Sequence, residues 1–114
     1  YKELLEEVFS ADFVLESTPE AGNMLKRYKE KHNKPCPQEN ICVVVYDAIY
    51  LLTEAIDNVG EDPIKIKNYL NTVQYQGISG TIGFDEFNDR KNANYSLFTM
   101  KNGKVMQVQT NWIP

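Results

Sequence analysis

The acidic run Asp85, Glu86 and Asp89 is the first candidate for chemistry, because closely spaced carboxylates bind calcium in helix–loop–helix sites. In such a loop, the other ligand positions carry oxygen donors and a glycine makes the sharp turn. Here Phe87 occupies a ligand position, and Arg90 stands where the glycine belongs. The sequence therefore favours a solvated turn over a metal site, and we expect no bound metal.

The other reactive residue types are scattered along the chain. Cys36 and Cys42 are the only cysteines, and their spacing lacks the Cys-x-x-Cys form of zinc and redox sites. A disulfide and two separate structural thiols both remain open. His32 falls at an expected helix end, where its charge complements the helix dipole, and Ser79 lacks the Gly-x-Ser-x-Gly spacing of a hydrolase nucleophile. Because no acid, base and nucleophile converge, we expect a protein that is not an enzyme and has no cofactor.

Length and charge narrow the function classes further. A chain of 114 residues suits one domain that buries about two-thirds of its extended surface. The net charge is −4, and the one basic cluster, from Lys26 to Lys34, contains Glu30 and no aromatic stacking motif. This cluster indicates a solvated helix face and no nucleic-acid partner. No apolar run approaches the ~20 residues of a membrane span. The tyrosines, including Tyr46, have the spacing of core or edge residues.

Helix signals occupy most of the first two-thirds of the sequence. Thr18-Pro19 and Asp62-Pro63 each place an N-capping side chain before a proline at the first helical position. The expected helices are Tyr1–Phe9, Pro19 to about His32, Ile41–Asn58 and Ile64–Asn71. The third of these is apolar on more than one face, so we expect it to pack on both sides.

Strand signals gather towards the end of the sequence. Asn102-Gly103 lies between alternating apolar residues and predicts a hairpin, because both turn positions need positive φ. The expected strands are Ala11–Glu16, Thr81–Phe84, Tyr95–Lys101 and Lys104–Gln109, and Val73–Gly77 is expected to be a loop. This order of elements predicts an α/β fold, a mixed sheet with three to four packed helices.

A series of motifs follows in a characteristic order and spacing. It comprises Tyr46-Asp47-Ala48 with the apolar helix after it, Glu54-Ala55-Ile56, Gly60, the Gly77–Asp89 run and the closing hairpin. Together these motifs resemble the carboxyl-terminal third of type I periplasmic-binding proteins, in the leucine/isoleucine/valine-binding branch that serves ABC importers. One departure is Asn88, where the family usually has glycine. Asparagine tolerates the left-handed region, so the turn should survive.

The resemblance implies that residues 1–114 form a single partial domain, the carboxyl-terminal third of a two-lobe solute-binding protein. It implies a periplasmic or extracellular protein, or a cell-surface lipoprotein, that passes its ligand to an ABC permease. The implied ligands are branched-chain amino acids or similar small amino-acid or amide molecules. A ligand-sensing domain of the same fold, in a receptor or an amide-responsive regulator, is the first alternative. A stand-alone interaction module without a small ligand is the second.

The resemblance also assigns roles to particular residues. Ile41 lies five residues before the helix tyrosine, at a family pocket position, so it would form an aliphatic wall of the ligand site. An ordinary core position for Ile41 is the alternative. Hinge strands near Leu15 and Leu97 would absorb the closure of the lobes. Export to an oxidising compartment would favour a disulfide between Cys36 and Cys42. Unpaired strand edges and apolar helix faces would make this chain a homodimer or higher oligomer.

Overall fold

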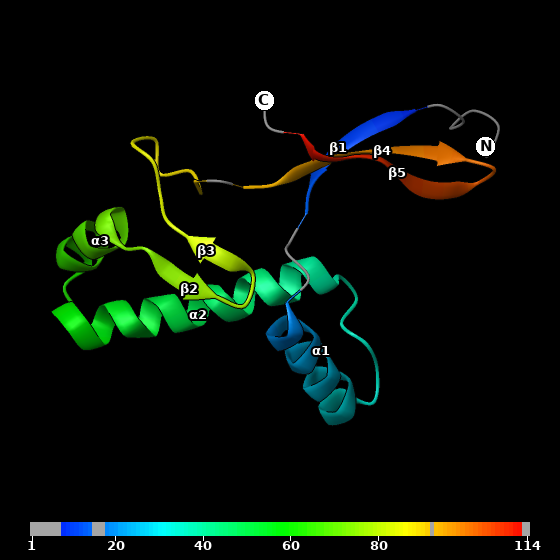
Figure 1. Cartoon of the computed structure of the whole chain (residues 1–114). Coiled ribbons are helices and arrows are strands. Elements are labelled where there is room, and N and C mark those ends of the chain that lie inside the picture. The colour runs from blue at the N-terminus through cyan, green and yellow to red at the C-terminus, as the bar shows by residue number, and fades with distance from the viewer. Residues whose placement is uncertain (1–7, 15–17, 92, 113–114) are drawn as a thin grey trace. The chain divides into compact units, whose positions relative to one another are not determined.

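The computed structural model describes residues 8–14, 18–91 and 93–112 (Figure 1). The chain divides into two compact units, Tyr1–Val14 with Asn92–Pro114 and Leu15–Lys91. The first unit is therefore built from segments at opposite ends of the sequence, and the second is continuous. The two units are described one at a time.

The discontinuous unit is an antiparallel sheet with the strand order β1-β4-β5. Its strands are β1 (Phe9–Phe13), β4 (Tyr95–Lys101) and β5 (Lys104–Trp112). The turn between β4 and β5 has φ of 53° at Asn102 and 69° at Gly103, as the hairpin signal predicted. β4 lies in the middle and buries Ser96, whose Oγ accepts a hydrogen bond of 2.7 Å from Gln107.

The continuous unit holds three helices: α1 (Pro19–His32), α2 (Glu39–Val59) and α3 (Pro63–Thr72). The Thr18 side chain caps α1 by accepting from the N–H of Ala21, and Asp62 caps α3. Gly60, with φ of 79°, ends α2. The two predicted N-caps are thus confirmed, and the predicted bounds of these three helices are correct to within two residues.

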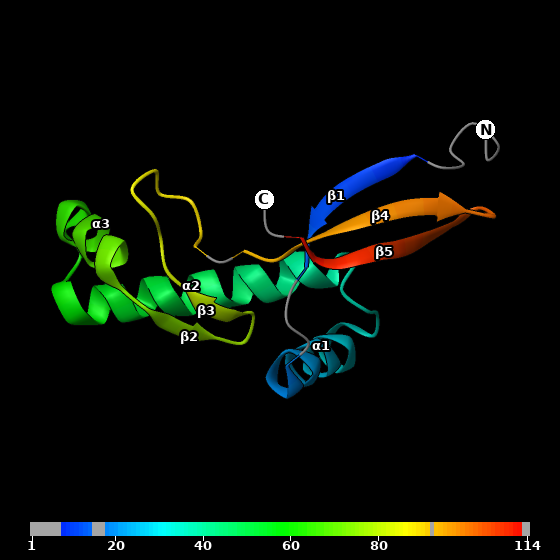
Figure 2. The same cartoon turned by 45° about the horizontal axis from the view of Figure 1, so that its top comes forward.

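A short hairpin lies beside α2 (Figure 2). Its strands are β2 (Tyr75–Gly77) and β3 (Gly80–Ile82), and they pair antiparallel. The acidic run follows as a tight loop, in which the Asp85 carboxylate accepts hydrogen bonds from the N–H groups of Phe87 and Asp89. Asn88 adopts φ of 69°, so this turn forms with asparagine in place of glycine.

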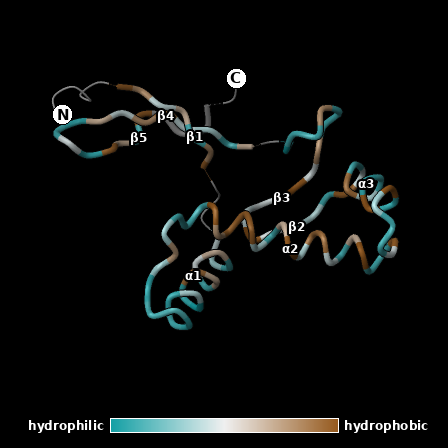
Figure 3. The backbone as a smooth tube through the Cα atoms, turned by 180° about the vertical axis from the view of Figure 1, so that it is seen from behind, coloured by the Kyte–Doolittle hydropathy of each residue, from teal (hydrophilic) through white to brown (hydrophobic). Residues whose placement is uncertain are grey.

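Apolar residues recur along α2, whereas α1 is largely hydrophilic (Figure 3). The core between these helices is built on Ala21, Met24 and Val43, with Ile78 packed against it. Further along α2, Leu51 and Ala55 are buried. Other apolar residues of α2 remain exposed in this unit, among them Ile49, which is 61% exposed. Within the described residues, no helix is both long and apolar enough to cross a bilayer.

The α/β fold class is confirmed, and several boundaries differ from prediction. The described strands pair only antiparallel, so in place of one mixed sheet there are two small sheets. The expected strand Ala11–Glu16 runs instead from Phe9 to Phe13, because pairing with β4 sets its register. Phe9 is therefore not helical, and residues 1–7 of the expected first helix lie outside the described residues. The expected loop Val73–Gly77 contains β2.

Candidate functional site

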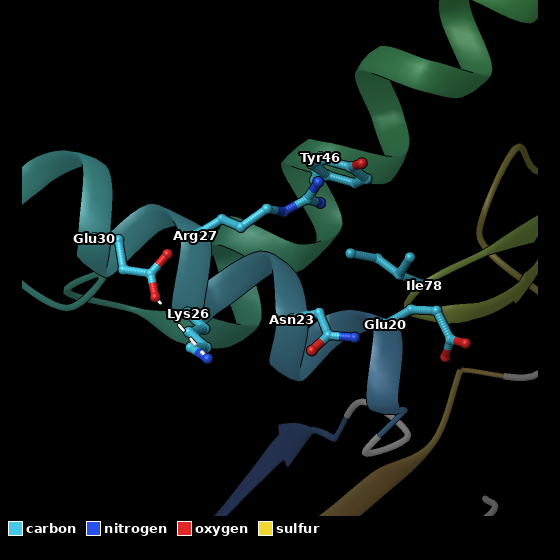
Figure 4. Close-up of a pocket in the computed structure, with 7 residues that line it drawn as sticks. All are labelled: Glu20, Asn23, Lys26, Arg27, Glu30, Tyr46 and Ile78. Atoms are coloured by element: carbon cyan, nitrogen blue, oxygen red, sulfur yellow. Dashed lines mark ion pairs between the residues drawn. The ribbon is translucent and has the colours of Figure 1, made fainter.

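A hollow of about 490 Å³ lies in the continuous unit, between α1, α2 and the turn from β2 to β3 (Figure 4). Its lining comprises Glu20, Asn23, Lys26, Arg27, Glu30, Tyr46 and Ile78. Residues three and four apart share one face of a helix, so the five lining residues from α1 form one side of the hollow. Tyr46 from α2 and Ile78 from the turn supply its less polar part.

α1 is held against the turn by its own capping residue. The Thr18 hydroxyl accepts from the N–H of Ala21 and donates a 2.7 Å hydrogen bond to the carbonyl of Ile78. The buried side chains of Met24 and Val43 then fill the space between α1 and α2. The hydrogen bonds of Thr18 therefore both begin α1 and hold it against the turn whose residue Ile78 lines the hollow.

The turn that carries Ile78 is held by a buried carboxylate on α2. Asp47 is only 1% exposed, and it accepts hydrogen bonds of 2.9 Å from the N–H of Ile78 and 2.7 Å from that of Ser79. From the other side, the Arg90 guanidinium donates to the carbonyls of Ser79 and Thr81. Among the described residues, Ser79 Oγ and Arg90 Nε are buried without a hydrogen-bond partner. The turn is thus fixed between a carboxylate and a guanidinium.

The aromatic side of the hollow is Tyr46, whose ring lies at a tilt beside that of Tyr50 on α2. The rings of Tyr46 and Tyr50 are 4.6 Å apart, and their hydroxyls are hydrogen-bonded. The hydrogen bond from Tyr50, and to a smaller extent that from Arg27, lowers the pKa of Tyr46. Donation of that hydrogen bond raises the pKa of Tyr50. The Arg27 side chain crosses from α1 towards the Tyr46 ring (Figure 4).

Of the residues considered in the sequence analysis, Tyr46 and part of the basic cluster line the hollow, and the others lie elsewhere. Ile41 is in the first turns of α2, is 44% exposed, and does not line the hollow. Cys36 and Cys42 form a disulfide, which settles the choice left open by their spacing. Leu97 lies inside β4, and Leu15 lies outside the described residues.

The expectation of a solvated acidic turn agrees with the structure. Two residues of that turn, Glu86 and Asp89, are exposed. In the described part of the chain, no group of three or more His, Cys, Asp or Glu side chains could hold a metal ion. His32 is in the last turn of α1, and its ring lies 4.4 Å from that of Tyr28. Its predicted place at the end of a helix is therefore confirmed.

The central residue that sequence reasoning missed is Asp47. It was noted as part of a family motif, but not as the anchor of the turn that bears Ile78. One signal was present, since a carboxylate in the middle of an apolar helix needs a hydrogen-bonding partner if it is buried. Its partners are 31 and 32 residues away, too far for local patterns to identify.

Comparison with known proteins identifies the family. The family model described as the receptor family ligand binding region matches residues 2–103. The chain belongs to this family. No curated protein matches the chain significantly.

Several solved structures are similar to this chain over almost its whole length. The leucine-binding protein LivK from Thermotoga maritima is 29% identical, with a TM-score of 0.66 over 96% of this chain and 32% of that one. LivJ from Streptococcus pneumoniae, solved with isoleucine, is 22% identical, with a TM-score of 0.62 over 91% of this chain and 30% of its own. A solute-binding protein from R. palustris, solved with benzoate, is 16% identical, with a TM-score of 0.65 over 94% of this chain and 30% of its own.

These similarities establish the type I periplasmic-binding fold, and the first two of these structures are of leucine-binding and branched-chain amino acid transporter proteins. The chain spans about a third of the length of the solved structures it matches. The predicted resemblance to this family is thus confirmed.

Proposed function

We propose that this chain is the carboxyl-terminal third of an extracytoplasmic solute-binding protein that supplies an ABC importer. In this proposal, residues 1–114 are one partial domain of a two-lobe protein that binds branched-chain amino acids or similar small amino-acid or amide ligands. The observation that carries the proposal is the 29% identity to a leucine-binding protein over 96% of the chain. The family and the similar solved structures are ligand-binding proteins, which favours binding over catalysis.

The division into two units supports a hinge mechanism. The backbone passes from one unit to the other at residues 14–15 and again at 91–92. Two such passages suit hinge closure, in which a few residues at the ends of elements absorb the change in φ and ψ. We propose hinge strands near Leu15 and Leu97: the first passage lies directly beside Leu15, and the second lies just before β4, the strand that contains Leu97.

Ile41 is our candidate for the ligand site of the whole protein. It is 44% exposed in the first turns of α2, and its neighbour Cys42 is tied to Cys36 by the disulfide. Partial exposure of an aliphatic side chain on an anchored turn suits an apolar pocket wall. In the complete protein, we expect Ile41→Trp to weaken the binding of bulky ligands while the protein stays folded. Unchanged affinity in a folded variant would contradict this role.

Titration calorimetry tests the function itself. The complete protein that contains this chain is titrated with leucine, isoleucine, valine and small amides, and so is the 114-residue chain alone. We expect saturable micromolar binding by the complete protein and none by the chain, because most of the family pocket would lie in the other two-thirds. Micromolar binding by the chain alone, or none of these ligands binding the complete protein, would refute the proposal.

The location and partners follow from the proposed role. Such a protein works in the periplasm or outside the cell, on its own or as a surface lipoprotein, and it docks on an ABC permease. We further propose that the 114-residue chain forms a homodimer or higher oligomer when isolated. Exposed apolar side chains of α2, including Val45, Ile49 and Leu52, favour self-association. Light scattering checks this point, and a monodisperse monomer of 13.1 kDa would contradict it.

A ligand-sensing domain is the second candidate function. The matching family is described as a receptor ligand binding region, which favours sensing as much as transport. The rest of the reading frame that encodes this chain, together with the neighbouring genes, distinguishes the two functions. A membrane segment followed by a signalling domain would favour the sensor, and adjacent permease genes would favour transport.

A further inference from the structure

The hollow between α1 and α2 contains a guanidinium that is not paired with a carboxylate. Among the described residues, the one ion pair is Lys26–Glu30, at 4.0 Å. The charges of that pair offset each other, and Arg27 beside it extends across the hollow to Tyr46 instead (Figure 4). Arg27 is therefore the cation of the hollow that is available to an anion.

The contact with Tyr46 prepares Arg27 for such a role. A guanidinium presents a planar fork of N–H donors that matches the two oxygens of a carboxylate. Its long side chain usually loses much rotamer freedom on binding, and this loss weakens affinity. Here the Arg27 side chain already reaches Tyr46, to which it donates a hydrogen bond. Less freedom thus remains to be lost when a carboxylate binds.

The other residues that line the hollow indicate which further groups its ligand should carry. Half-buried Ile78 offers an apolar surface next to the amide of Asn23. Glu20 lines the hollow near Ile78, seven residues before Arg27 along α1. At about 1.5 Å of rise per residue, these two residues are about 10 Å apart along the helix. The hollow thus places a positive group at one end, a negative group at the other, and an apolar surface between them.

We propose that this hollow binds an aliphatic carboxylate that carries a positive group at its far end. The carboxylate pairs with Arg27, the aliphatic stem lies against Ile78 and Tyr46, and the ammonium faces Glu20. Both a free ω-amino acid and the carboxyl end of a basic peptide have this chemistry. The hollow lies wholly within the continuous unit and does not include Ile41, our candidate for the ligand site of the complete protein, so this proposal does not depend on the proposed function.

An NMR titration of the ¹⁵N-labelled 114-residue chain tests the proposal, with 6-aminohexanoate as the probe. We expect saturable millimolar binding, with shifts at Arg27, Tyr46 and Ile78. Arg27→Gln should weaken binding by about tenfold, as expected for loss of one charged hydrogen-bonding partner. Arg27→Lys keeps the charge without the fork and should weaken it less. Lys29→Gln is the matched control, because it removes the same charge from an exposed position of α1 outside the hollow.

Further ligands test each part of the site. In the wild type, hexanoate should bind more weakly than 6-aminohexanoate, because it lacks the ammonium. In the Glu20→Gln variant, the two ligands should bind with equal affinity. The tripeptide Lys-Gly-Leu should bind, and its carboxyl-amidated form should not. Tighter binding of the peptide than of 6-aminohexanoate would identify a peptide end as the source of the ligand, and the reverse would identify a free acid.

Three results would overturn the proposal. The first is the absence of a saturable shift in the folded wild type with both 6-aminohexanoate and the tripeptide Lys-Gly-Leu. The second is equal affinity in wild type and Arg27→Gln. The third is a loss in Lys29→Gln as large as that in Arg27→Gln, since binding would then reflect only the overall charge of α1.

Discussion

Gly77→Ala is expected to destabilise the continuous unit through a single steric conflict. A Cβ at Gly77 would lie 2.5 Å from Cγ and 2.9 Å from Oδ1 of Asp47, and closer still to Oδ2. The Asp47 carboxylate would have to move away from the turn. Gly77 is not among the glycines with positive φ, so alanine fits its backbone conformation without strain. The whole penalty therefore comes from the displaced carboxylate.

The size of the effect follows from the hydrogen bonds that Asp47 makes. Its carboxylate accepts from two backbone N–H groups, those of Ile78 and Ser79. A hydrogen bond to a charged group contributes about 1.5–3 kcal/mol, and partial loss of two such bonds costs roughly 2–4 kcal/mol. Replacing glycine with alanine returns about 0.4–1 kcal/mol by restricting the unfolded chain. We therefore expect a net loss of about 2–3 kcal/mol.

Urea unfolding of a double-mutant cycle measures this effect. Asp47→Ala alone should cost about 3 kcal/mol, because it leaves two N–H groups without an acceptor. In that background, Gly77→Ala should be neutral or slightly stabilising, since the group it displaces is gone. The coupling energy should therefore be about 2–3 kcal/mol. If Asp47→Ala does not fold, Asp47→Ser completes the cycle, because serine also lacks the atoms that a Cβ at Gly77 would meet.

Gly22→Ala is the matched control for the glycine itself. Gly22 is an exposed position of α1 where a Cβ would meet nothing within 4 Å. Here alanine should stabilise by about 0.5–1 kcal/mol through helix propensity. Strict additivity of Gly77→Ala and Asp47→Ala would refute the argument, because the two residues would then act independently.

Three other changes have defined outcomes. Reduction of the Cys36–Cys42 disulfide, which closes a loop with a sequence separation of 6, should lower the unfolding free energy by about 2 kcal/mol, seen as a lower urea midpoint. The hydrogen bond to Glu54 raises the pKa of Tyr69, so its stabilising effect is complete below the unfolded tyrosine pKa of about 10 and is lost as the pH rises through the folded pKa. Tyr69→Phe should therefore be less stable than wild type at neutral pH, and unfolding curves should converge in strong base; a constant gap would contradict this. Gly103→Ala should cost about 1 kcal/mol, because φ there is 69°, and an unchanged midpoint would contradict the turn assignment.

Features set by neighbouring residues were predictable from the sequence. The caps at Thr18 and Asp62, each followed by proline, mark two helix starts through local hydrogen bonds. The turn at Asn102-Gly103 fixes the β4–β5 hairpin through backbone conformations that few residues adopt. In each case, all the interacting groups lie within a few residues of one another.

Features set by distant partners were not predictable in the same way. β2 has only three residues, and its hairpin is fixed to α2 by Asp47, some 30 residues earlier. Likewise, β1 begins at Phe9 because it pairs with β4, about 90 residues later. The pattern of apolar residues along α2 also did not reveal that Asp47, a carboxylate, is one of its most buried side chains. Periodicity describes the face of an element but not its partners.

Adjacent residues of α2 therefore have separable roles. Asp47 fixes the turn that carries Ile78, and Tyr46 points into the hollow beside Arg27. Loss of the Asp47 contacts should lower stability and also distort the hollow, because Ile78 is part of both. Loss of the Arg27 guanidinium should weaken carboxylate binding about tenfold and leave the urea midpoint almost unchanged, since exposed charges contribute little to stability. Measuring stability and binding on both variants thus separates the residue that builds the site from the residue that recognises the ligand.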